Sequence, residues 1–139
     1  MLKNILVAVD GSEFTARVMQ ALTELQLQPT TKTILVRVVP ATESEEPVDR
    51  PQSNSEELLY RQIEKELQPY QAALPCPSEL EIVTGDPATE IVRLAHIHSC
   101  DLIVLGSRGL TGMKRILQGS VSSQVLEDAP CSVLVVKYK

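Results

Sequence analysis

The sequence predicts a doubly wound, Rossmann-like α/β fold with a five-stranded parallel sheet and four helices. Five short apolar runs rich in β-branched residues recur along the chain, and amphipathic segments separate them. Apolar runs of this kind are typical of strands that are buried on both faces of a parallel sheet, whose neighbours require helical crossovers. The 139 residues suffice for one domain, so we expect a single domain over residues 1–139.

The first half of the chain contains two of these strands and one helix. Residues 4–9 form a continuous apolar run that ends at Asp10-Gly11-Ser12. Ser12 is a good N-cap for a helix whose apolar residues recur at helical spacing over residues 14–25. Residues 33–39 predict the second strand, and the acidic, proline-containing stretch 40–54 predicts a surface loop.

The second half continues the alternation. A helix is expected from Ser55, broken or kinked near Pro69. Its apolar stripe would consist of Leu58, Leu59, Ile63 and Leu67. Further strands are predicted at 80–84, 101–105 and 132–136, and further helices at 91–97 and 121–126.

Composition excludes several classes of function. The net charge of −5 and the absence of Trp disfavour binding to nucleic acids and to anionic membranes. No apolar run is long enough to cross a bilayer, so a cytoplasmic protein is expected. The three cysteines form no C-x-x-C pair, which disfavours a disulfide framework and a zinc site. His96 and His98, two apart on a helix, face different directions and cannot form a two-histidine metal site.

The loop after the fourth strand is the strongest functional signal. Residues 106–120 hold four of the six glycines and three basic residues but no acid, which favours a phosphate-bearing ligand. We expect Gly119-Ser120 to open the following helix, where free N–H groups could hold a phosphate. The alternative is a connecting loop in which Ser120 is only an N-cap. Asp10 also has two interpretations: a cap of the first helix, or a ligand to ribose hydroxyls, adenine or a metal ion whose identity stays open.

The spacing Gly106-x2-Gly109-x9-Gly119-Ser120 resembles the nucleotide-binding signature of the universal stress protein family. Four other segments are similar to landmarks of that family: I-L-V-A-V-D-G-S, G-D-P, D-L-I-V-L-G-S-R-G and P-C-S-V-L-V-V-K. The resemblance implies strand order 3-2-1-4-5 and ATP as the ligand, with or without Mg²⁺.

The resemblance also implies a role for each site residue. By similarity, Asp10 would meet the ribose and adenine end, and Arg108 would assist from outside the motif. The remaining residues would line the adenine pocket (Ala8, Val38), pack near the sugar (Leu105, Gly106) or hold the phosphates (Gly109, Gly119, Ser120, Val121, Ser122).

These features predict an ATP-binding stress-response regulator or sensor with at most weak hydrolysis, and we assign no catalytic residue. The alternative is a slow ATPase, or an enzyme that phosphorylates itself at Ser120 or Ser122. A receiver domain fits poorly, because Gly11-Ser12 occupies the place of the adjoining acids it needs. The last strand, Ser132 to Lys137, is apolar on both faces and predicts a homodimer by strand pairing. A protein partner is expected but not identified.

Overall fold

The computed structural model describes residues 2–10, 14–40, 52–107 and 115–137, and it gives 52–56 and 115–120 only as helical backbone. Ser12 and the acidic loop from Glu43 to Asp49 therefore lie outside the described residues. The described strands are β1 (Asn4–Val9), β2 (Lys32–Val39), β3 (Ser78–Thr84), β4 (Leu102–Gly106) and β5 (Ser132–Val136). The described helices are α1 (Phe14–Thr23), α3 (Gln52–Ala72), α4 (Pro87–Ile97) and α5 (Arg115–Asp128).

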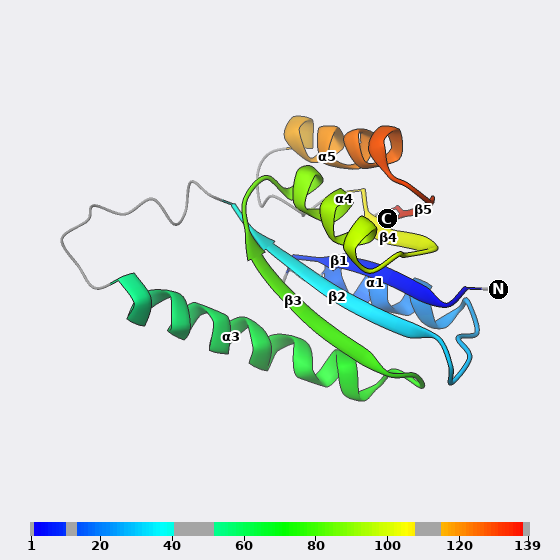
Figure 1. Cartoon of the computed structure of the whole chain (residues 1–139), viewed down its shortest axis with the longest axis horizontal. Coiled ribbons are helices and arrows are strands. Elements are labelled where there is room, and N and C mark those ends of the chain that lie inside the picture. Colours follow the sequence, from blue (N-terminus) through cyan, green and yellow to red (C-terminus); the bar gives the residue numbers. More distant parts are fainter. Residues whose placement is uncertain (1, 11–13, 41–51, 108–114, 138–139) are drawn as a thin grey trace.

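The five strands form one parallel sheet in the order β3-β2-β1-β4-β5, which confirms the predicted fold class. Figure 1 shows α4 and α5 on one side of the sheet and α3 on the other. Two hydrophobic clusters fill the spaces between these layers. One contains side chains of α4 and α5, and the other contains side chains of α1 and α3. The strands contribute alternate residues to the two clusters, because successive side chains of a strand point to opposite faces.

Helix α3 differs from its prediction in three respects. It begins at Gln52 rather than near Ser55, and it continues through Pro69 to Ala72 without a break. Proline has no N–H and therefore removes one hydrogen bond from a helix. Pro69 is tolerated because it lies in the last turn, where that loss falls near the helix end. The predicted stripe is buried only at Ile63 and Leu67. Leu58 and Leu59 are 67% and 39% exposed, so they do not join the core.

Helix α5 begins at Arg115, four residues before the predicted start. Gly119 and Ser120 consequently lie inside the helix and not at its first turn. The prediction that they open the helix, with free N–H groups at that point, is wrong. Residues 115–118 are Arg, Ile, Leu and Gln, which are compatible with helix and extend it toward the amino end.

The free edge of β3 is covered by a side chain of α3. The Tyr60 hydroxyl donates a hydrogen bond of 2.5 Å to the carbonyl oxygen of Ile82. A bond of this kind occupies an acceptor that another strand would otherwise use. At the opposite edge, the side chains of Val133, Leu134 and Val135 on β5 are only half-buried. The two edges of the sheet therefore differ in how far they are protected.

Asp101 fastens the start of the chain to the start of β4. Its Oδ2 accepts hydrogen bonds from the backbone N–H groups of Lys3 (2.8 Å) and Asn4 (3.0 Å). These two bonds hold the pKa of the Asp101 carboxyl below its ordinary value. The stabilisation that the two bonds give is fully present above the pKa of the carboxyl in the unfolded chain, which is about 4. It is lost as the pH falls from there through the lower pKa of the folded state.

We therefore expect Asp101→Ala to be less stable than the wild type at pH 7, by on the order of 1 kcal/mol given the exposure of the bonds. The difference should shrink as the pH falls from about 4 toward 2, because the wild-type carboxylate is then protonated as well. Urea denaturation at a series of pH values measures both effects. A difference that stays constant down to pH 2 would show that the charge of Asp101 contributes nothing.

No helix among the described ones combines the length and the apolar character that crossing a membrane requires.

Candidate functional site

The carboxyl ends of β1 and β4 lie side by side at the point where the winding of the sheet reverses. Val7 pairs with Leu35 of β2 on one side and with Val104 of β4 on the other. The helix that follows β1 packs in one hydrophobic cluster, and the helix that follows β4 packs in the other. The helices that follow β1 and β4 therefore lie on opposite faces of the sheet. In open α/β sheets, ligands bind in the crevice expected at such a switch point.

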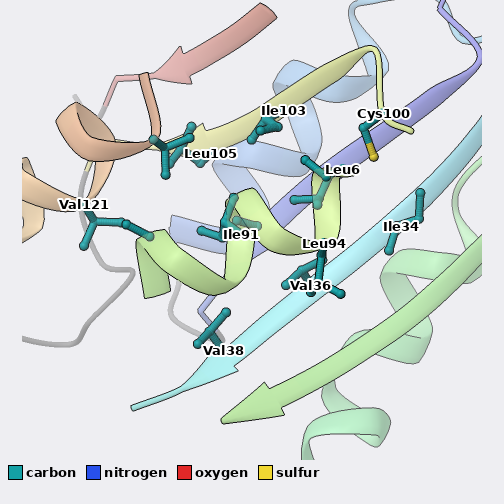
Figure 2. Close-up of a cluster of buried hydrophobic side chains, with 14 residues drawn as sticks. Leu6, Ile34, Val36, Val38, Ile91, Leu94, Cys100, Ile103, Leu105 and Val121 are labelled. Atoms are coloured by element: carbon teal, nitrogen blue, oxygen red, sulfur yellow. The ribbon is translucent and has the colours of Figure 1, made fainter. Parts of the chain in front are cut away.

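Four apolar residues of the predicted site belong to a single buried cluster. They are Ala8, Val38, Leu105 and Val121. In Figure 2, Leu105 and Val121 lie near one another and Val38 lies near the end of β2, whereas Cys100 lies at the opposite end of the cluster. The structure thus places the four predicted apolar residues in one buried cluster, away from the Cys100 end.

Asp10 lies half-buried directly after β1. The hydroxyl of Thr15, a buried residue in the first turn of α1, donates a hydrogen bond of 3.3 Å to Asp10 Oδ1. The contact orients the carboxylate at the switch point and also connects it to the start of the helix. Both sequence-based interpretations of Asp10 are compatible with this geometry. The participation of Thr15 was not predicted, although a hydroxyl five residues after a strand-end Asp is a recognisable pattern.

Gly106, the last residue of β4, makes a close approach to the ring of Phe14. A Cβ atom at Gly106 would lie 2.4 Å from Cε2 and 2.9 Å from Cδ2 of that ring. Contacts this short do not occur between real atoms, so only glycine fits while the ring keeps its position. Gly106 thus positions α1 against the end of β4. The sequence signal was a glycine at a strand end, which often marks a close approach, but its partner Phe14 was missed.

The predicted phosphate-binding residues are described only in part. Val121 and Ser122 are buried on α5. Gly119 and Ser120 lie on the same helix, directly before them, and are described as backbone alone. Arg108 and Gly109, together with Gly112 and Lys114, lie outside the described residues. The structure therefore gives the helix that carries the second half of the motif, whereas of the first half it describes only Gly106.

A hollow of 290 Å³ lies at the β3 edge of the sheet. Its walls come from α3 and β3: Tyr60, Glu64, Leu80, Glu81 and Ile82. None of these is a predicted site residue, and β2 and β1 separate β3 from the switch point. The hollow therefore provides no support for the predicted nucleotide site.

The pKa values of the three cysteines disfavour a catalytic role. Burial, then the neighbouring Cys131 and then Asp101, raise the pKa of the Cys100 thiol to about 11. Burial also raises the pKa of Cys131 and of Cys76. Because the thiolate is the nucleophile and the metal-binding form, raised pKa values disfavour both roles. All three thiols are free in the structure.

The fold agrees with a comparison to known families. The family model described as the universal stress protein family matches residues 1–137. The chain belongs to that family. Among relatives, universal stress protein MJ0531 of Methanocaldococcus jannaschii is 53% identical over 57 residues, which are 41% of this chain and 34% of that protein. A universal stress protein of Thermus aquaticus is 32% identical over 143 residues and covers 99% of this chain and 100% of the relative.

Solved structures of universal stress proteins share the fold. The structure of M. jannaschii protein MJ0577 superposes with a TM-score of 0.85 at 29% identity, covering 100% of this chain and 98% of that chain. A universal stress protein in complex with cAMP gives a TM-score of 0.69 at 23% identity, over 98% and 97% of the two chains. One from Archaeoglobus fulgidus in complex with dAMP gives 0.59 at 22% identity, over 99% and 100%.

Proposed function

We propose that this universal stress protein binds ATP in the crevice between the ends of β1 and β4 and acts as a cytoplasmic regulator or sensor. The observation that carries the proposal is that β1, which ends just before Asp10, pairs with β4, whose last residue Gly106 begins the glycine-rich segment. That segment carries three basic residues in a chain whose net charge is −5. Backbone N–H groups in glycine-rich turns and basic side chains both favour a polyphosphate.

The ligand that we propose is an adenine nucleotide, and in particular ATP. Two proteins of this fold were solved with the adenine nucleotides cAMP and dAMP. At 23% and 22% identity these likenesses show the fold alone. The case for ATP in this chain therefore depends on its own residues: an apolar wall that includes Ala8 and Val38 for the base, and the full glycine motif for the phosphates.

Binding is tested by isothermal titration of nucleotide-free protein with ATP, ADP, AMP, cAMP and GTP. We expect ATP to bind most tightly, since the motif offers donors to more than one phosphate. The chain has no Trp and only three Tyr, so retained nucleotide would also dominate the ultraviolet spectrum of the purified protein. A clean spectrum together with no heat from ATP would overturn the proposal. Single-turnover assays separate a sensor, which keeps ATP intact for hours, from the slow ATPase alternative.

We also propose that two copies pair through the outer edge of β5. Ser107 N–H donates to the Val136 carbonyl oxygen (2.9 Å), so Val136 bonds toward β4. Because backbone groups of successive residues point to opposite sides of a strand, the N–H of Val135 points to the outer edge. Half-buried apolar side chains on β5 would become covered in a symmetric pair.

Val135→Pro should therefore yield a monomer, because it removes an outward donor and leaves the bonds to β4 in place. Val135→Thr is the matched control, since it keeps the N–H and the β-branched shape, and it should remain a dimer. Light scattering after size-exclusion chromatography measures the mass of each. A Val135→Pro variant that is folded and wholly dimeric would exclude pairing through this edge.

A further inference from the structure

Three potential metal ligands meet on the outer part of the sheet, away from the switch point. Glu79 and Glu81 are alternate residues of the edge strand β3, so both side chains point to the same face. His98 is the C-cap residue of α4, which packs on that face. One ligand atom from each of the three lies within 4.8 Å of the other two. The closest pair is His98 Nε2 and Glu81 Oε2, at 2.9 Å.

The backbone fixes the position of the histidine. The N–H of His98 donates to the carbonyl oxygen of Leu94 (2.9 Å), and the N–H of Cys100 donates to that of Ala95 (2.9 Å). These bonds close the end of α4 and hold His98 over β3. The side chains of His98 and Glu81 are only 16% and 32% exposed, whereas that of Glu79 is 47% exposed. Two ligands are thus held in place, and the third is free to adjust.

Lys32 is the charged group that would compete with a metal ion for Glu79. Its Nζ lies 2.6 Å from Glu79 Oε2. This contact also holds the pKa of the Glu79 carboxyl below its ordinary value, so the carboxylate is ionised. Two carboxylates and one ammonium group leave an excess of negative charge beside an imidazole nitrogen. Lys32 is 41% exposed and can swing into solvent when a cation replaces it.

We propose that Glu79, Glu81 and His98 bind a divalent transition-metal ion, with Zn²⁺ as the best fit. One imidazole nitrogen and two carboxylate oxygens match zinc, which takes three protein ligands and a water, whereas Mg²⁺ and Ca²⁺ prefer oxygen alone. In tetrahedral zinc sites, bonds of about 2 Å place the ligand atoms about 3.3 Å apart. The ligand atoms here lie within 4.8 Å of one another, so the more exposed Glu79 would move inward by up to about 1.5 Å. The ion would join the end of α4 to the edge strand. The site does not depend on the proposed nucleotide function.

The two histidines of the chain provide an internal control. His96 is exposed and lies two residues from His98 on the same helix end, outside the cluster. We expect Zn²⁺ added to nucleotide-free protein to shift the ring signals of His98 in a ¹H–¹⁵N spectrum and to leave those of His96 unchanged. Signals that stay in place for both histidines at a tenfold excess of Zn²⁺, or that shift alike, would overturn the proposal. This measurement needs no variant.

Variants then test the individual ligands. His98→Gln and Glu81→Gln should weaken Zn²⁺ binding at least tenfold in isothermal titration, whereas His96→Gln should bind as the wild type does. Lys32→Ala should tighten binding several-fold, because it removes the competitor of the metal at Glu79. Zn²⁺ should also raise the melting temperature of the wild type but not of His98→Gln. Equal affinity in wild type and His98→Gln would exclude the site.

Discussion

A Gly119→Val variant is expected to bind ATP at least about 100-fold more weakly than the wild type, a loss of about 2.7 kcal/mol. The branched side chain would occupy space that the proposed site reserves for phosphate oxygens against bare backbone. Because Gly119 lies within α5, valine there should not reduce helix stability, since glycine is the weaker helix former. Isothermal titration with ATP measures the loss.

A matched control separates this effect from a general disturbance of α5. Gln124→Val introduces the same side chain into the same helix at an exposed position, and it should keep wild-type affinity. Circular dichroism melting curves of both variants establish that the fold is retained. If Gly119→Val is folded and binds ATP as tightly as Gln124→Val does, the phosphates are not held at this helix and the proposed site is misplaced.

Gly106→Ala should lower the free energy of unfolding by about 1–3 kcal/mol, the usual cost of an added methyl group in a filled core. The cause is the 2.4 Å approach between the new Cβ and Phe14 Cε2, which forces the ring away from the end of β4. Urea denaturation measures the loss. Because the same ring begins α1 next to Asp10, ATP affinity should fall as well.

A double-mutant cycle shows whether the ring is responsible. Phe14→Leu is destabilising by itself, because a buried aromatic side chain is lost. In that background, however, Gly106→Ala should cost less than about 0.5 kcal/mol, since the clashing atoms are absent. Additive effects of the two substitutions would show that the glycine is needed for another reason.

The strands were predictable because each is a short apolar run whose ends coincide with polar residues, glycine or proline. β1 and β5 have the predicted bounds, and the parallel orientation of the strands follows from their alternation with helices. Helix starts were less predictable. In α5 the glycine at 119 was interpreted as a start, whereas Arg115 to Gln118 already form helix. A glycine inside a helix costs only about 1 kcal/mol, which the packing of the helix can offset.

Contacts between distant elements were the part of the site that the sequence could not provide. The apolar site residues were named from the family resemblance, and their membership of one buried cluster is compatible with it. The approach of Phe14 to Gly106 depends on how α1 is placed against β4, and the contact of His98 with Glu81 depends on where α4 ends above β3. Neither placement can be inferred from the spacing of residues along the chain. The two histidines were rejected as a metal-binding pair, although His98 has carboxylate neighbours on another element.

The hydrogen bond from Tyr60 to Ile82 has a consequence for how this protein would aggregate. It comes from the half of α3 in which Leu58 and Leu59 contribute little to the core. That half of the helix should therefore fray before the sheet melts. Fraying would uncover the Ile82 carbonyl and the outer side of β3 while the remaining strands are still paired. Fibril growth would then start from a nearly native molecule, and Tyr60→Phe should shorten its lag time.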